Sequence, residues 1–164
     1  MIVPEAPHPD HVPNTFFADL DWDISQSPRP LLADSSFDTK SSAFIPPLTR
    51  CKIVCRGTPW KFEIKARKQQ PHITIASLLN DISSQLLRTV DIDIYRRHRS
   101  TEKKNEIMHA YLERCNSLPT HNERMAALSD WILRVDYFLV GTHFLAFEQN
   151  SAGGDVFDLI TAPI

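Results

Sequence analysis

The sequence has little of what usually marks a catalytic centre. Only four glycines occur in 164 residues, and they form neither a phosphate-binding loop nor a dinucleotide-binding fingerprint. The zinc-protease motif H-E-x-x-H and the nucleophile elbow G-x-S-x-G are also missing. The seven histidines do not have the spacing of metal ligands. We therefore expect neither a metal nor a cofactor.

Cysteine and long apolar runs are scarce as well. Three cysteines cannot form a closed disulfide framework, which is typical of a reducing compartment. Cys51 and Cys55 are spaced C-x₃-C, but no second pair completes a zinc site. No apolar run approaches the roughly 20 residues that cross a bilayer, and the N-terminus has no secretory signal. The pattern predicts a soluble intracellular protein, cytoplasmic or nuclear, without a membrane partner.

Proline is abundant and unevenly placed. Eight of the twelve prolines fall within the first 47 residues. This bias predicts a Pro-rich, mostly irregular N-terminal arm over residues 1–42 and a single α+β domain over residues 43–164. Trp22 lies between two aspartates in this arm, and an exposed Trp would gain little there. We expect Trp22 to be buried against the domain, so that the arm is partly docked.

Charge is also unevenly placed, although the net charge is only −2. Residues 50–114 carry fourteen basic and seven acidic side chains, and both flanking segments are acidic. The densest basic cluster is made of Arg96, Arg97, Arg99, Lys103 and Lys104. The cluster is a candidate site for an anion or nucleic acid. Because no aromatic residues interleave with it to stack bases, we expect a solvated face, and nucleic acid is not an expected partner.

Local patterns predict two hairpins and several helices. Residues 50–56 and 60–66 alternate between apolar and charged side chains on either side of a turn at Gly57, with Trp60 starting the second strand. Residues 142–148 and 156–161 predict a second hairpin.

Helices are predicted between the two hairpins. Thr74 caps one that ends near residue 88, on an apolar stripe. The others cover residues 91–99, the stretch from Ser100 or Thr101 to Leu118, and a turn or two from Asn122 to about Trp131. This order predicts an α+β fold. A small, mostly antiparallel sheet of about four strands would have three to four helices inserted between its hairpins and packed on one face.

The stretch from residue 134 to 147 surrounds a few polar groups with large apolar side chains. Arg134 and Asp136 are embedded among leucine, valine and aromatic residues, so we expect them to be partly buried and to bind the backbone or each other. A structural pair is the first interpretation. The second is that Arg134, Asp136 and His143 line a cleft and carry an unknown reaction, with Cys51 or Cys115 as nucleophile.

A set of short motifs resembles a domain of unknown function that is abundant in mushroom-forming (basidiomycete) fungi. The motifs run in order from Trp22–Ser25 through Ala43 with Pro46-Pro47, Pro59-Trp60, Ile73–Leu79, Arg114, Arg134–Leu139 and Thr142 with Phe144. The resemblance spans about residues 20 to 161. The family pattern has an acidic residue at Ser77, Gly at Ala146 and Trp near Phe157. The resemblance supports a fold and a lineage, and it implies no activity.

Three function classes remain open. The first is a non-catalytic module that binds another protein, and it requires only residues already explained by packing. The second is the enzyme with a cleft around Arg134, Asp136 and His143. The third is an anion or nucleic-acid binder that uses the basic cluster. Structural roles are expected for Trp22, Trp60, Thr74, Arg114, Arg134 and Asp136.

Overall fold

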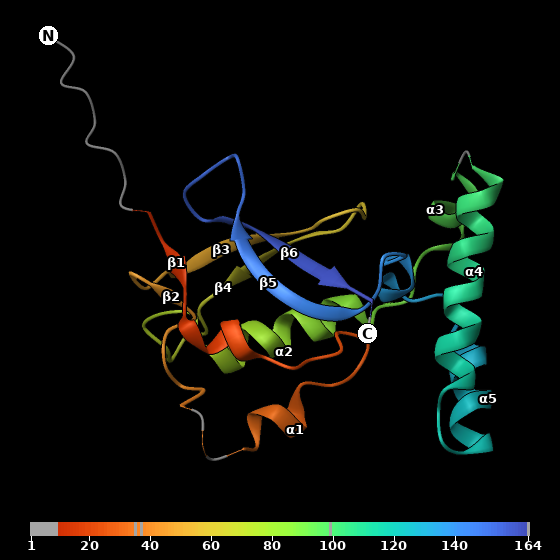
Figure 1. Ribbon diagram of the computed structural model, residues 1–164, viewed down its shortest axis with the longest axis horizontal. Helices are drawn as coiled ribbons and strands as arrows, with labels where there is room; N and C mark the ends of the chain where they lie inside the picture. Colours follow the sequence, from red (N-terminus) through yellow and green to blue (C-terminus); the bar gives the residue numbers. More distant parts are fainter. Residues whose placement is uncertain (1–9, 35, 37, 99, 164) are drawn as a thin grey trace, which may run out of the picture.

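A four-stranded sheet with the strand order β4-β3-β6-β5 forms the centre of the fold (Figure 1). The computed structural model describes residues 10–34, 36, 38–98 and 100–163. The strands are β3 (Arg50–Cys55), β4 (Lys61–Lys65), β5 (His143–Gln149) and β6 (Val156–Ala162). Both predicted hairpins are present, because β3 pairs antiparallel with β4 and β5 pairs antiparallel with β6.

The two hairpins join in parallel, which the hairpin patterns did not indicate. β6 lies beside β3 and runs in the same direction, with Ile53 opposite Phe157. The sheet is therefore mixed, although we expected it to be mostly antiparallel. A parallel pair needs a long crossover connection. Here the connection from β3 to β6 runs through β4, the helical segment and β5.

Alternating side chains give the sheet one buried face. In β4, Phe62 and Ile64 are buried, whereas the charged residues between and beside them are exposed. Helix α2 (Ile75–Leu86) packs against the sheet and buries its own apolar stripe in the same core. As predicted, Thr74 begins this helix. Its hydroxyl accepts a hydrogen bond from the backbone of Ser77, and the Ser77 side chain accepts one from the backbone of Thr74.

The N-terminal arm has more structure than predicted. It contains the short strand β1 (Val12–Pro13), paired with β2 (Phe44–Ile45), the 3₁₀ helix η1 (Thr15–Asp19) and the single-turn helix α1 (Arg29–Leu32). Trp22 is only 2% exposed, so its predicted burial is confirmed. The backbone of the arm also bonds to the chain around β5, from Ile24 to Thr142 and from Phe144 to Trp22.

The remaining helices form a second layer beside the sheet. They are α3 (Ile92–Arg96), α4 (Thr101–Asn116) and α5 (His121–Asp130). Ser100 caps α4, as one of the two predicted positions, whereas α5 is capped by Thr120, two residues before the predicted Asn122. Helix α5 ends at Asp130, because Trp131 adopts a left-handed φ of 72°.

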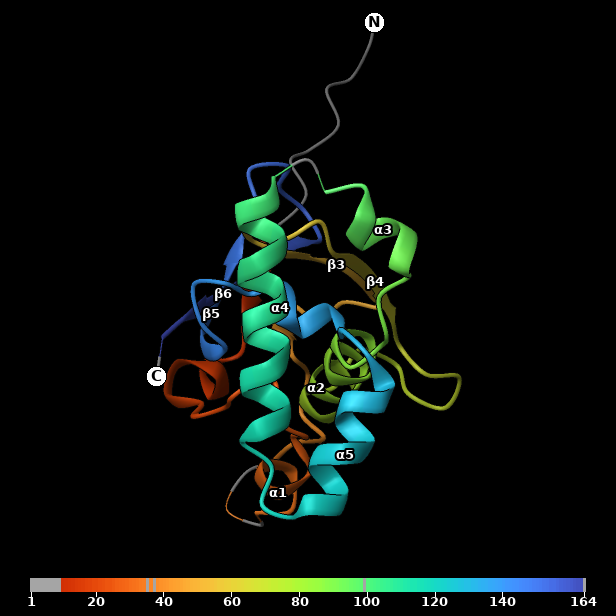
Figure 2. The ribbon, with the colours of Figure 1, turned by 90° about the vertical axis from the view of Figure 1, so that its right-hand side faces the viewer.

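Helices α4 and α5 do not cover the sheet face, which corrects the expected packing on one face. Figures 1 and 2 show them standing side by side as a hairpin next to the body that contains the sheet. They have a core of their own, built around Ile107, Tyr111 and Cys115 of α4 with Ala127 and Ile132. The 3₁₀ helix η2 (Arg134–Tyr137) connects this hairpin to the body, since Tyr137 belongs to the second core and Val135 to the first.

No helix within the described ranges is both long enough and apolar enough to cross a membrane.

Candidate functional site

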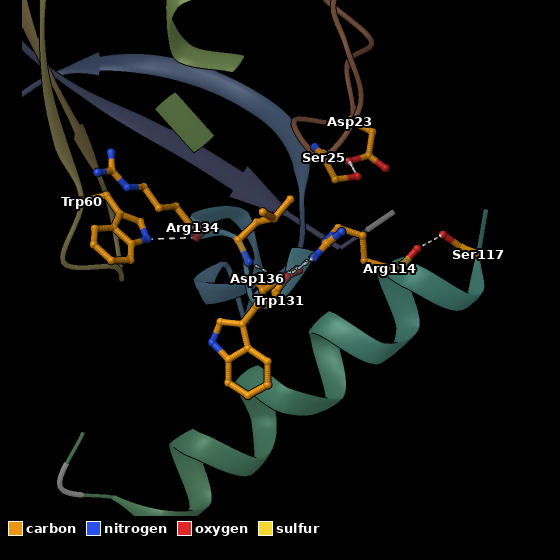
Figure 3. A network of polar contacts seen from close by, with 9 residues as sticks. Asp23, Ser25, Trp60, Arg114, Ser117, Trp131, Arg134 and Asp136 are labelled. Carbon is orange, nitrogen blue, oxygen red and sulfur yellow. Dashed lines mark hydrogen bonds and ion pairs between the residues drawn. The ribbon is translucent and has the colours of Figure 1, made fainter. Parts of the chain in front are cut away.

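An ion pair with two hydrogen bonds joins Asp136 of η2 to Arg114 of α4 (Figure 3). Nε of Arg114 donates to Oδ1 of Asp136 over 2.7 Å, and Nη2 donates to Oδ2 over 2.9 Å. Asp136 is 4% exposed, and it also accepts a hydrogen bond from the Leu133 backbone. Burial lowers the pKa of Arg114, but its contact with Asp136 raises that pKa above the ordinary value overall. This arrangement is a two-pronged, charge-assisted pair.

Both residues are at least partly buried, and Asp136 binds the backbone, as expected, but the expected pairing of Arg134 with Asp136 is wrong. Arg134 points the other way and lies over the rings of Trp60 and Phe62, 5.3 and 5.9 Å from their centroids. Its Nη1 donates to Oε1 of Gln85 in α2, and its carbonyl accepts from the indole of Trp60 (Figure 3). On a 3₁₀ helix, with about three residues per turn, positions two apart point in different directions. On the strand that would have placed Arg134 and Asp136 together, they would have shared a face.

His143 lies apart from both residues. It starts β5, and its Nδ1 is 3.7 Å from a carboxylate oxygen of the exposed Asp21. Its backbone forms an isolated bridge with Asp23. The structure thus places Arg134, Asp136 and His143 in three different surroundings, and of the three only Asp136 lines a cleft.

That cleft lies between α4 and the body. Its volume is about 1630 Å³, above the roughly 300–1,000 Å³ of small-molecule pockets. One wall is a face of α4. The other walls come from Leu87 at the end of α2, the loop of residues 23–27, and the chain from Leu133 to Thr142. Arg114 and Asp136 both line it, so their ion pair bridges from α4 to the opposite wall.

The wall contributed by α4 is acidic. Glu102, Glu106 and Glu113 are spaced i, i+4 and i+11, which places them on one side of the helix, and all three are exposed. His109 also lies on this side, with its Nδ1 3.7 Å from Glu113. Lys103 lies 3.5 Å from Glu106. Ile107, Tyr111 and Cys115, the buried residues of α4, face the second core instead.

The opposite wall exposes apolar side chains. Val140 is 61% exposed and Leu87 is 37% exposed, and both line the cleft together with Leu139. Gly141 allows this wall to turn toward β5. Its φ is 124°, and a Cβ at this position would overlap the carbonyl of Ala162.

The predicted basic cluster is divided by the structure. Arg96 and Arg97 are exposed at the end of α3, whereas Lys103 lines the cleft beside Glu106. Lys104 is half-buried, and its carbonyl accepts a hydrogen bond from Tyr95. Arg99 lies outside the described residues. The described members therefore do not share one face with a common polar target.

The thiols are inaccessible. All three cysteines are fully buried and unpaired. Burial raises the pKa of Cys51 and of Cys55 to about 12, and burial also raises the pKa of Cys115. A thiol with a raised pKa is a poor nucleophile at neutral pH. Among the residues that the structure describes, no three His, Cys, Asp or Glu side chains could hold a metal ion together.

Sequence reasoning did not single out the acidic wall of the cleft. The spacing of the α4 glutamates was visible in the sequence, but the position of α4 opposite an apolar wall depends on η2 and the second core.

One comparison with known proteins gives a match. A model of a family of unknown function, DUF6699, matches residues 20–155. No curated protein and no solved structure matches the chain. The matched segment begins just before Trp22 and includes α4, η2 and the cleft between them. The chain therefore belongs to DUF6699, a family of unknown function.

Proposed function

We propose that this protein is a non-catalytic interaction module that binds a segment of another protein in the cleft between α4 and the body. The observation that carries the proposal is the cleft itself, which is too large for a typical small-molecule pocket, with exposed glutamates on the α4 wall and exposed apolar side chains on the opposite wall. Exposed apolar residues that line a concave surface are a common mark of a protein-binding site.

The enzyme alternative has less support. Its three proposed residues lie in separate surroundings, and Asp136 is already engaged by Arg114 with two hydrogen bonds. Its proposed nucleophiles, Cys51 and Cys115, are fully buried. The anion-binding alternative is likewise weakened, because Lys103 and Glu106 form a local ion pair.

The remaining predictions are retained as part of the proposal. Residues 1–42 are a partly docked arm on a domain formed by residues 43–164. Structural roles are proposed for Trp22, Trp60, Thr74, Arg114, Arg134 and Asp136, in keeping with their burial and hydrogen bonds. A fungal origin and an intracellular location also remain predictions.

Selection from a random peptide library tests the cleft. Ala110 lines it from α4, so Ala110→Trp should obstruct the cleft. Ala126→Trp is the matched control, because Ala126 is an exposed residue of α5 outside the cleft lining. We expect peptides selected on the wild type to bind Ala126→Trp equally and Ala110→Trp at least tenfold more weakly. Selection that yields no peptide sensitive to Ala110→Trp would refute the proposed function.

A further inference from the structure

The occupant of the cleft can be described more closely. Building on the proposed function, we infer that the bound segment is a cationic amphipathic helix, with Lys or Arg facing α4 and apolar residues facing the wall around Val140. Four features support this inference, namely the charge of the lining, the spacing of its acidic residues, the position of its apolar residues and the type of backbone that surrounds it.

The lining has an excess of negative charge. It contains five carboxylates and two cationic side chains, which gives a formal charge of −3 with His109 neutral. Three of the carboxylates are the glutamates of α4, and the other two, Asp23 and Asp136, lie on the walls opposite α4. Asp136 is neutralised by Arg114, and Lys103 lies near Glu106. No Lys or Arg partner lies within ion-pair distance of Glu102 or Glu113 in the described part of the chain; the contact of Glu113 is with His109. Cationic side chains complement such a wall, and anionic ones are repelled by it.

The acidic side chains follow a helical spacing. Glu102, Glu106 and Glu113 recur over three turns on one side of α4. From Glu102 to Ser117 the lined face of α4 extends about 22 Å at 1.5 Å per residue. A partner helix of about 15 residues, lying along α4, would bring a charged residue of its own near each glutamate. Recognition of this kind uses anchors at the i, i+4 and i+7 positions of the bound helix.

The apolar side chains lie on the wall opposite this charge. Leu139 and Val140 come from the segment that follows η2, and Leu87 comes from the end of α2. A bound helix would therefore meet the three glutamates of α4 on one side. On the other side it would meet exposed apolar groups beside Asp23 and the paired Asp136. An amphipathic helix has the same two-sided character.

The backbone of the cleft favours a helix over an extended peptide. Its described lining residues belong to α4, the end of α2, η2 and loops, so the lining lacks a strand with a free edge. Extended peptides usually bind by adding a strand to such an edge. A helix satisfies its own backbone hydrogen bonds and needs only side-chain contacts from the cleft.

Three synthetic helical peptides with one apolar pattern test the inference. They carry Lys, Gln or Glu at the same polar positions, and binding is followed by fluorescence anisotropy. The Lys peptide should bind the wild type at least tenfold more tightly than the Gln or Glu peptide. Its affinity should fall as salt rises from about 50 to 300 mM, because salt screens the exposed charges.

Two triple variants of equal net charge test whether the Lys peptide binds to the glutamates of the cleft. The triple variant Glu102→Gln/Glu106→Gln/Glu113→Gln removes three carboxylates from the cleft. The control Asp19→Asn/Glu63→Gln/Glu148→Gln removes three exposed carboxylates elsewhere, so both proteins have the same net charge. We expect the cleft variant to lose at least tenfold in affinity for the Lys peptide and the control to stay within twofold of the wild type. Equal losses in both would overturn the inference, since net charge alone would then explain the binding.

The binding of these peptides to the wild type and to Ala110→Trp distinguishes failure of this inference from failure of the proposed function. If the Gln or Glu peptide binds as tightly as the Lys peptide and Ala110→Trp blocks it, the cleft is a docking site but its occupant is not cationic. If the Lys peptide binds but is insensitive to Ala110→Trp, the inference is wrong because the peptide binds elsewhere. If no peptide binds, the inference is again overturned, and selection from the library decides the function by itself.

Discussion

At the scale of single residues, Asp136 links helix α4 to the start of η2. It binds Arg114 of α4 through both carboxylate oxygens and fixes the start of η2 through the Leu133 backbone. Because η2 belongs to both cores, this carboxylate holds the α4–α5 hairpin against the body. Both members of the pair also line the cleft, on opposite walls.

Breaking this pair should be costly. Asp136→Ala leaves Arg114 largely buried without its partner, so we expect a loss of about 3–5 kcal/mol in the free energy of unfolding, measured with urea. The double variant Arg114→Ala/Asp136→Ala should lose clearly less than the sum of the two single variants. Arg134→Ala is the control, and its loss should add to that of Asp136→Ala because the two side chains do not bond. Additive losses for Arg114 and Asp136 would contradict the assigned pairing.

Two buried tyrosines, Tyr111 and Tyr137, differ in whether their hydroxyl groups are hydrogen-bonded. Tyr111 donates to the carbonyl of Leu128 over 2.6 Å, whereas the buried hydroxyl of Tyr137 meets no hydrogen-bond partner within the described chain. Tyr111→Phe should cost about 1 kcal/mol. Tyr137→Phe should be neutral or slightly stabilising, because it removes an unpaired polar group. A clear loss of thermal stability in Tyr137→Phe would show that the hydroxyl has a partner, such as an ordered water.

At the scale of elements, a polar cluster connects the two hairpins of the sheet. Asp158 of β6 accepts hydrogen bonds from Arg56, which follows β3, and from Asn150 in the turn between β5 and β6. Burial alone raises the pKa of Asp158, but these two hydrogen bonds lower it, and the net result is below the ordinary value of 3.8. The cluster lies where β3 and β6 run in parallel.

This contact should make stability depend on pH. Because the folded state lowers the pKa of Asp158, its contribution is fully present above about pH 4 and is lost as the pH falls through the folded-state pKa. Asp158→Asn should therefore be less stable than the wild type at pH 7, and the difference should shrink below pH 4. Urea unfolding at pH 7, 5 and 3 measures this difference. A difference that stays constant with pH would argue against an ionised Asp158 in the cluster.

An element could be predicted from the sequence where the residues that determine it lie close together in the chain. Thr74 and Ser77 are three residues apart, and the alternation in β4 repeats every second residue, so both were readable from the sequence. The parallel pairing of Ile53 with Phe157 joins distant positions, and no local pattern encodes it. The partner of Asp136 was missed for the same reason, because Arg114 lies in another helix.

At the scale of the whole molecule, two cores meet at η2. The first surrounds the sheet and α2 and includes Phe17, Trp22 and Ile24, and the second belongs mainly to the α4–α5 hairpin. Cysteines report on both, since Cys51 and Cys55 lie in the first core and Cys115 lies in the second. Their burial makes thiol labelling a measure of how each core opens.

The native protein should resist thiol reagents. Burial raises the pKa of all three thiols, to about 12 for Cys51 and Cys55, so few thiolates form at pH 8. With an aromatic disulfide reagent we expect slow labelling in buffer and three rapidly labelled thiols in denaturant. Rapid labelling of Cys115 alone would show that the α4–α5 hairpin opens separately from the body. Rapid labelling of all three would contradict their burial.

The central claim is that the cleft between α4 and the body is the binding surface of this protein. An amide NMR titration of the ¹⁵N-labelled protein with the Lys peptide tests it most directly, because the backbone amides of the non-proline residues report on binding in one experiment. The largest amide chemical-shift changes should fall on α4 around Ala110 and on residues 139–142, with little change in β4. Shifts centred on β4, or on the exposed side of α5 around Ala126, would contradict it.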